Sequence, residues 1–127
     1  MVSQFTETKD HPSYDLLLLQ RLAAADSIIY ASVRNIEACL GRLGYDHENL
    51  RSCIAQLSPD DFDKSGRYVN GAVTTVWMDV YRLKCTYYPH DNSDEGAMQD
   101  DLYIKLSLSR DCVCVTVQSF HEWGRQL

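Results

Sequence analysis

The spacing of the apolar residues changes near the middle of the chain, from a helical period to the alternation typical of β-strands. Before Gly66 the apolar residues recur every three or four positions, and one clear set is Val33, Ile36, Leu40 and Leu43. After residue 70 they alternate with polar residues. Helices followed by antiparallel strands predict a compact α+β domain, with N-terminal helices packed on a mainly antiparallel sheet.

The first half carries start and stop signals for three helices and a single helical turn. Residues 14–25 have leucines on all sides, which suits a buried helix. Ser32 is a candidate N-cap for a second helix that Gly44 is well placed to end. Asp46 is a candidate cap for a third helix. Ser58-Pro59 then opens a further turn, with the proline at the first helical position.

The second half is expected to supply most of the sheet. Residues 74–86 alternate in polarity and predict a strand. Residues 102–108 and 113–118 alternate in the same way around a short turn, so they predict a hairpin with one apolar and one polar face. Residues 28–31, in the first half, fit either a short strand or an extended link.

A chain of 127 residues suits one domain. We expect a flexible leader over residues 1–13 and a single domain over 14–127, with a solvent-exposed acidic insertion at 88–101. No segment reaches the roughly 18 apolar residues of a membrane span, and the N-terminus shows no signal-peptide pattern. A cytoplasmic location without membrane contact is therefore expected. Five cysteines without a Cys-x-x-Cys pair favour reduced thiols over a disulfide framework or structural zinc.

The net charge of −6 argues against a nucleic-acid partner, because phosphate binding normally uses basic surface. Five of the 18 acidic residues lie in the acidic insertion, however, which leaves 13 acids against 12 bases elsewhere. A local basic patch therefore remains compatible with the composition. The bases that could form it in the second half are Lys64, Arg67, Arg82, Lys84, Lys105 and Arg110.

The polar face of the predicted hairpin carries the side chains best suited to chemistry. Tyr103, Lys105 and Gln118 would be near neighbours there, with Arg82 at the end of the preceding strand and Lys64 on the turn before it. Such a set, without paired carboxylates or a metal cluster, suits RNA cleavage without metal or cofactor. In that reaction the 2′-hydroxyl attacks its own phosphate, and cations stabilise the charge that develops.

Simpler interpretations of the same residues stay open. Lysine and tyrosine on the open face of a hairpin are usually solvated strand residues. Trp77 and Tyr81 could stack on bases, but a tryptophan is more often a packing residue. Cys112 and Cys114 could hold a soft metal with His121 or His90, although two ordinary thiols are the better interpretation of this pair.

Five short motifs occur in order along the chain. They are Leu57-Ser58, Asp61-Phe62-x-Lys64-Ser65, Trp77-x-Asp79-Val80-Tyr81-Arg82, Tyr103-x-Lys105, and Asp111 followed by Val113-x-Val115-Thr116. In these motifs the chain resembles the MqsR family, the mRNA-interferase toxins of bacterial type II toxin–antitoxin systems. The resemblance covers roughly residues 32–120.

The resemblance implies a RelE-like fold and a growth-arresting endoribonuclease that cuts single-stranded mRNA sequence-selectively and without metal. It also implies a cognate antitoxin that silences the toxin, and a contact with DNA only through that antitoxin. Lys64 matches the family's lysine in Asp-Phe-x-Lys-Ser, Tyr103 matches the tyrosine in Tyr-x-Lys, and Arg82 matches the arginine after Val-Tyr.

Three positions depart from the family pattern. Met78 replaces a glutamine, and Asp63 replaces a tyrosine beside Lys64. The lysine that ends the family's last strand aligns with Gln118 by direct count, or with His121 if Ser-Phe is matched to Ser-Phe. His121 could act as an acid or base near neutral pH.

The expected site is thus a catalytic set with RNA-binding residues around it. The catalytic residues are Lys64, Tyr103 and His121, and the RNA-binding residues are Arg67, Tyr81, Arg82, Lys105 and Gln118. An alternative from another class is a catalytically degenerate domain that binds a protein, with the acidic insertion resembling nucleic acid. RNA binding without cleavage lies between the two.

Overall fold

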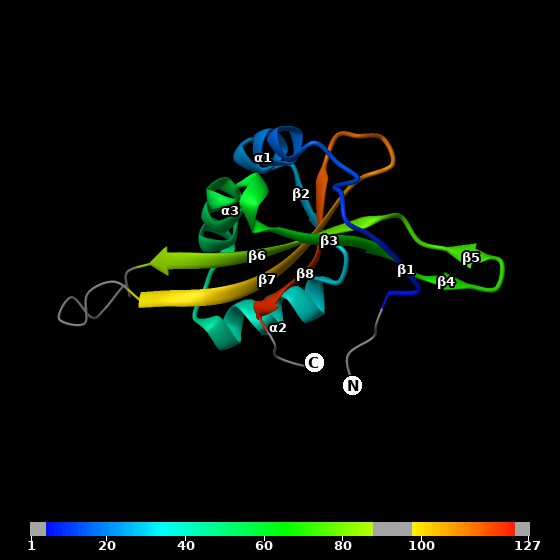
Figure 1. Ribbon diagram of the computed structural model, residues 1–127. Helices are drawn as coiled ribbons and strands as arrows, with labels where there is room; N and C mark the ends of the chain where they lie inside the picture. The colour runs from blue at the N-terminus through cyan, green and yellow to red at the C-terminus, as the bar shows by residue number, and fades with distance from the viewer. Residues whose placement is uncertain (1–4, 88–97, 124–127) are drawn as a thin grey trace.

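A six-stranded sheet organises the molecule (Figure 1). The computed structural model describes residues 5–87 and 98–123. The sheet order is β1-β3-β6-β7-β8-β2, and only the β2–β8 pair is parallel. The strands are β1 (Glu7–Lys9), β2 (Ile28–Tyr30), β3 (Phe62–Arg67), β6 (Met78–Tyr87), β7 (Met98–Leu108) and β8 (Val115–Glu122). A separate pair, β4 (Val69–Asn70) and β5 (Val73–Thr74), forms a small hairpin.

Three helices supply the rest of the core: α1 (Leu16–Ala24), α2 (Val33–Leu43) and α3 (His47–Gln56). Ser32 caps α2 by accepting from Asn35 N–H, and Gly44 ends it in the left-handed conformation. Asp46 forms a capping box with Asn49 at the start of α3. A 3₁₀ turn, η1 (Pro59–Asp61), follows. These starts and stops confirm the sequence prediction, because capping depends on side chains close in the chain.

The helices and one face of the sheet share a single apolar core. In Figure 1, α1 and α3 lie side by side and α2 lies next to β8. The sheet side of this core consists of Tyr81, Leu83, Leu102, Ile104, Leu106, Val115, Val117 and Phe120. The α+β architecture with helices on a mainly antiparallel sheet is therefore confirmed, and the opposite face of β3, β6, β7 and β8 is left for polar side chains.

The N-terminal segment is tied to the sheet instead of forming the flexible leader expected over residues 1–13. β1 pairs antiparallel with β3. The fully buried Asp79 carboxylate accepts from Ser13 N–H at 2.9 and 3.1 Å and from Tyr14 N–H at 3.0 Å. The prediction was wrong for residues 5–13 because these partners are more than 50 residues away in sequence, where local patterns carry no information.

Two strand boundaries also differ from the prediction. Lys64 lies within β3 and not on a turn. β3 was missed because it has almost no apolar alternation. β7 begins at Met98, so Asp100 and Asp101 belong to a strand; residues 88–97 of the expected acidic insertion lie outside the described residues.

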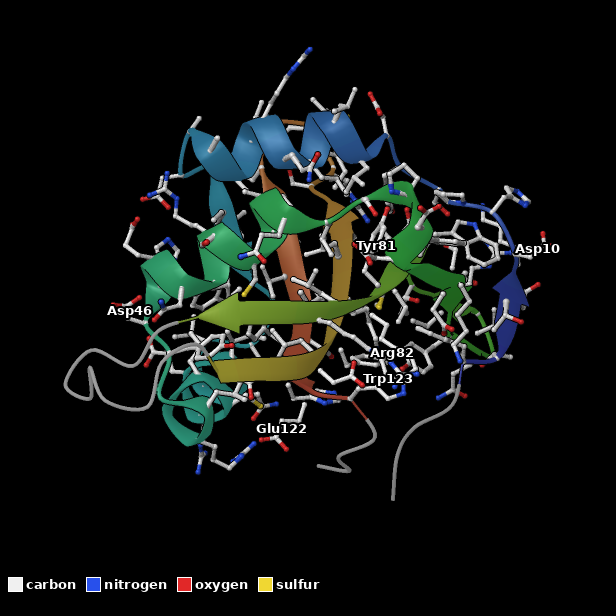
Figure 2. All side chains as sticks on the ribbon, turned by 60° about the vertical axis from the view of Figure 1, so that its left-hand side comes forward. Asp10, Asp46, Tyr81, Arg82, Glu122 and Trp123 are labelled. Carbon is white, nitrogen blue, oxygen red and sulfur yellow. The ribbon has the colours of Figure 1, made fainter. Side chains whose placement is uncertain are left out.

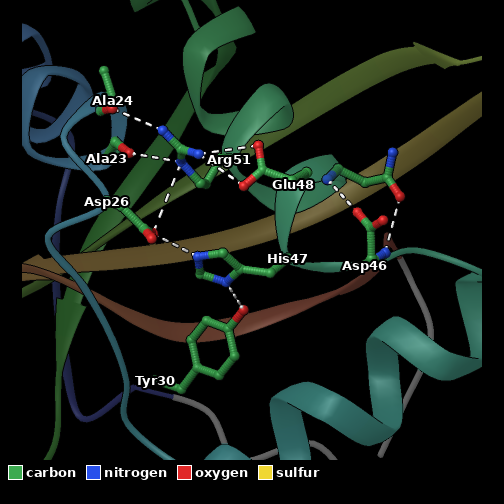
Figure 3. Close-up of polar contacts among 9 residues, drawn as sticks. Ala23, Ala24, Asp26, Tyr30, Asp46, His47, Glu48 and Arg51 are labelled. Carbon is green, nitrogen blue, oxygen red and sulfur yellow. Dashed lines mark hydrogen bonds and ion pairs between the residues drawn. The ribbon is translucent and has the colours of Figure 1, made fainter.

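A polar network joins the end of α1, β2 and the start of α3 (Figure 3). His47 Nε2 lies 2.6 Å from Asp26 Oδ1, and His47 Nδ1 lies 2.5 Å from the Tyr30 hydroxyl. Arg51 donates to the carbonyl oxygens of Ala23 and Ala24 and to the Glu48 carboxylate. We call Asp26, Tyr30, His47, Glu48 and Arg51 the helix-end network, and its contacts fix how three elements meet.

Candidate functional site on the open face of the sheet

Two cross-strand rows of side chains lie on the sheet face opposite the core. In antiparallel sheets, directly paired residues point to the same face, so the register identifies the rows. The first row runs Lys64, Val80, Lys105 and Ser119 across β3, β6, β7 and β8. The second row runs Arg82, Tyr103 and His121 across β6, β7 and β8. We call these seven residues the open-face cluster.

A β-bulge in β3 brings a carboxylate to the edge of this cluster. The register between β3 and β6 shifts between Phe62 and Lys64, and Asp63 is the extra residue. The Asp63 carboxylate lies 3.9 Å from Lys64 Nζ. It also acts on Tyr103, because its negative charge contributes to raising the pKa of that phenol. The Lys64 side chain remains 45% exposed, so its ammonium is available to an anion.

Lys105 is nearly covered, although it stands in the middle of a polar row. The residue is 9% exposed. Its Nζ donates to the Tyr68 hydroxyl at 3.3 Å and lies 4.7 Å from the centre of the Phe5 ring. Burial, and secondarily the nearby Lys64 ammonium, lowers the pKa of Lys105 to about 8. A lysine that binds phosphate at an open surface would not be covered in this way.

Aromatic rings form a stack at the other end of the cluster. Tyr103 and His121 are nearly parallel, with ring centres 4.7 Å apart, and Trp123 lies 5.5 Å from Tyr103. The Arg82 guanidinium lies over the Trp123 ring at 4.7 Å and pairs with Asp101 at 2.6 Å (Figure 2). The hydrogen bond to Asp101 raises the pKa of Arg82, which therefore stays charged beside the stack.

The contacts of Tyr103 and His121 determine where each side chain carries a hydrogen. Burial, then the neighbouring Tyr68 and Asp63, raises the pKa of Tyr103 to about 12. Tyr103 therefore keeps its proton at neutral pH and is a donor. His121 Nδ1 lies 2.8 Å from the Glu122 carbonyl oxygen, which can only accept, so Nδ1 carries a hydrogen. Proton exchange by this ring then takes place at Nε2.

The structure separates the two candidates for the end of the last strand. His121 pairs directly with Tyr103 and stacks on it. Gln118 falls at the register shift opposite Lys105 and Leu106, and its amide donates to the Ser107 hydroxyl at 3.0 Å. The direct count along the sequence favoured Gln118, but a bulge moves the register by one residue and cannot be counted from sequence. His121 is the residue within the open-face cluster.

Besides Gln118, two more residues expected to bind RNA are not in the cluster. Tyr81 is 1% exposed and packs edge-on against Phe62 in the core, so its ring has no surface to offer a base. Figure 2 shows Tyr81 and Arg82 on opposite sides of β6. Arg67 pairs with Glu7 at 2.7 Å and lies over the Trp77 ring at 4.5 Å. Strand alternation directs it away from Lys64, which explains why it does not join the cluster.

Sequence reasoning missed three aromatic residues that complete the site: Phe5, Tyr68 and Trp123. Phe5 packs on Tyr68 with ring centres 5.0 Å apart. It also lies against Gly66, where a Cβ would collide with its ring. Trp123 is a second ring, besides His121, that contacts Tyr103. Each is single in its local sequence, so no pattern marks it. Met78, which replaces the family glutamine, lies opposite Gly66 and is 8% exposed.

Other kinds of site find less support. Within residues 5–87 and 98–123, no three His, Cys, Asp or Glu side chains gather as a metal site would require. Cys112 is exposed, and Cys114 is partly buried. None of the described helices has the length and apolarity to cross a bilayer.

The comparison with known proteins identifies the family of the chain. No curated protein gives a significant match. A family model described as motility quorum-sensing regulator, toxin of MqsA, matches residues 11–122. The matched segment contains every residue of the open-face cluster. Because the match spans most of the chain, the protein belongs to the MqsR family, the toxins of a toxin–antitoxin system.

Proposed function

We propose that the protein is an endoribonuclease that cuts single-stranded mRNA sequence-selectively and without a metal ion, in the cytoplasm. The observation that carries the proposal is the open-face cluster itself: Lys64, Arg82 and Tyr103 converge on one face, with His121 stacked against the tyrosine. Cations and a phenol at this spacing suit a phosphodiester that gains negative charge during reaction.

The chemistry needs no group from outside the chain and the RNA. The ribose 2′-oxygen loses its proton to a base and attacks the adjacent phosphorus. A new P–O bond forms, and the bond from phosphorus to the 5′-oxygen of the next nucleotide breaks. That 5′-oxygen takes a proton from an acid. The products are a 2′,3′-cyclic phosphate and a 5′-hydroxyl.

The residues divide these tasks by charge and proton state. The exposed Lys64 ammonium would stabilise the charge on the phosphorane oxygens, and Arg82 would hold a neighbouring phosphate. Tyr103 would donate a hydrogen bond to the phosphate, because its high pKa keeps the phenol protonated. His121 would protonate the leaving oxygen from Nε2.

The decisive experiment is incubation of a long single-stranded RNA with purified protein in excess chelator, with mapping of the cut ends. Wild-type protein should produce discrete cuts, and Lys64→Ala should reduce the rate by about a hundredfold or more because an oxyanion-stabilising group is lost. Lys9→Ala is a matched control, because Lys9 lies over Trp77 away from the cluster. Equal cleavage by wild type and Lys64→Ala would refute the assigned role.

A cognate antitoxin should silence this activity, and a titration of cleavage against antitoxin would measure it. One pair of observations favours a second function, protein binding without catalysis. Met78 offers no strong hydrogen bond to RNA, and Asp63 places a negative charge beside Lys64. This alternative predicts intact RNA at every protein concentration, together with a stable antitoxin complex.

A further inference from the structure

Lys105 is an unusual lysine, because it is buried and no carboxylate among the described residues pairs with it. Within the described residues, no Asp or Glu oxygen lies within 4.0 Å of its Nζ. The contacts around Nζ are instead the Tyr68 hydroxyl at 3.3 Å and three aromatic rings, Phe5, Tyr68 and Tyr103, at 4.7, 5.5 and 5.8 Å. We call these rings the aromatic cover. Burial without an opposite charge disfavours the protonated amine.

The charges that face Lys105 make its protonated form still less favourable. Lys64, across Val80 in the same row, adds a second positive charge. Tyr68 and Tyr103 are neutral phenols at neutral pH, because burial raises the pKa of both. On β8, Ser119 faces Lys105 and His121 stands in the next row. Asp63, at the bulge of β3, pairs with Lys64.

The other members of the cluster leave one task of the reaction unfilled. Arg82 remains charged, and Tyr103 keeps its proton, so neither accepts a proton near neutral pH. His121 is assigned above as the acid for the leaving oxygen, so it is not also the base in the same step. The exposed ammonium of Lys64 serves as a cation. The reaction still requires a group that takes the proton from the 2′-hydroxyl.

On the ribonuclease function proposed above, we propose that Lys105 is the general base, whose neutral amine accepts the ribose 2′-proton between Lys64 and Tyr103. The amine nitrogen gains the proton and becomes an ammonium, while the 2′-oxygen attacks phosphorus and the 5′-oxygen leaves with a proton from His121. Water then removes the extra proton from Lys105 and restores that of His121. This assignment replaces the phosphate contact expected for Lys105 from sequence.

Phe5 acts as a positioning residue in this scheme, because it keeps water from the Lys105 amine. Its ring lies on Gly66 and Tyr68 and is held there by the pairing of β1 with β3. With Phe5 removed, the pKa of Lys105 should move from about 8 toward the ordinary value of 10.5. Less of the lysine would then be neutral at pH 7.5, and the rate there would fall.

The experiment is single-turnover RNA cleavage in chelator between pH 6 and pH 9.5. Lys105→Arg keeps the positive charge but cannot become neutral, so it should lose about a hundredfold or more in rate, as expected for a general base. Lys9→Arg is the matched lysine-to-arginine control and should cleave normally. Phe5→Ala should lower the rate most at low pH, and its deficit relative to wild type should shrink as pH rises toward 10.5, because the acid role of His121 affects both proteins equally.

Each outcome decides between the two proposals. Cleavage by wild type together with near-normal cleavage by Lys105→Arg would overturn the general-base role and leave the ribonuclease standing, with only a positive charge required at position 105. No cleavage by wild type at any pH would overturn both. A readout independent of activity is NMR titration of the Lys105 side chain. A value near 10.5 in the wild type, unchanged in Phe5→Ala, would contradict the proposed role of the cover.

Discussion

The helix-end network and the open-face cluster are both rich in charged and polar side chains, but they are built in opposite ways. In the helix-end network each carboxylate has a hydrogen-bond partner: His47 binds Asp26, and Arg51 binds Glu48. In the open-face cluster, Lys64 and Lys105 share a row with only valine between them. Paired polar groups fix structure, whereas crowded like charges raise the free energy of the empty site.

The difference distinguishes a structural cluster from a functional one within a single chain. An anionic ligand offsets the repulsion between neighbouring cations, and a phosphodiester supplies that anion. The same argument reconciles the proposed action on RNA with an acidic protein: the open face holds its cations locally, while the acids of the helix-end network bind partners of their own. Net charge describes the whole molecule and not this face.

The largest effect is the loss of cleavage expected for Tyr103→Phe, which tests whether the open-face cluster serves function and not stability. This change keeps the ring that stacks on His121 and removes only the hydroxyl. We expect cleavage to fall by about a hundredfold because a proton donor to the phosphate is lost, while thermal unfolding stays close to wild type. Rates from mapped RNA ends and calorimetry would measure the two quantities. A large loss of stability with little loss of rate would place Tyr103 among the structural residues.

The next largest effect is a gain in stability when a charge is removed from the open-face cluster. Lys105→Met should stabilise the protein on the order of 2 kcal/mol at pH 7, because it removes a charge whose pKa folding lowers from 10.5 to about 8. The unfolded chain binds this proton more tightly, so the penalty is complete below pH 8 and is relieved as pH rises toward 10.5. The gain over wild type should therefore shrink between pH 7 and pH 9.5 in thermal melts. A gain independent of pH would show that packing, not charge, is responsible.

The smallest effect is a loss of stability in the helix-end network, which tests whether that network is purely structural. His47→Ala removes the imidazole that links Asp26 to Tyr30 and should lower the free energy of unfolding by less than Lys105→Met raises it, because the two lost hydrogen bonds are partly exposed to water. Cleavage should not change, because the helix-end network does not reach the open face. Denaturant unfolding and the cleavage assay would be compared on one preparation. A drop in cleavage beyond the change in folded fraction would couple the two regions.

Several parts of the fold were predictable because their causes are local. Ser32, Gly44 and Asp46 start and stop helices through contacts within four residues, and the structure shows all three in these roles. The alternation of residues 102–108 likewise placed Tyr103 and Lys105 on one face. Alternation also carried a signal that was overlooked, since Tyr81 and Arg82 are adjacent in a strand and must point to opposite faces.

The sequence by itself determined the class of fold, the helix ends, the hairpin and the motifs that identify the family. Only the tertiary structure decided that residues 5–13 pair with and contact the sheet, that His121 and not Gln118 lies opposite Tyr103, and that Phe5 covers Lys105. Those features depend on pairings between distant segments and on bulges that shift the register. Local spacing carries no information on them, because they follow from how the strands meet once the core has formed.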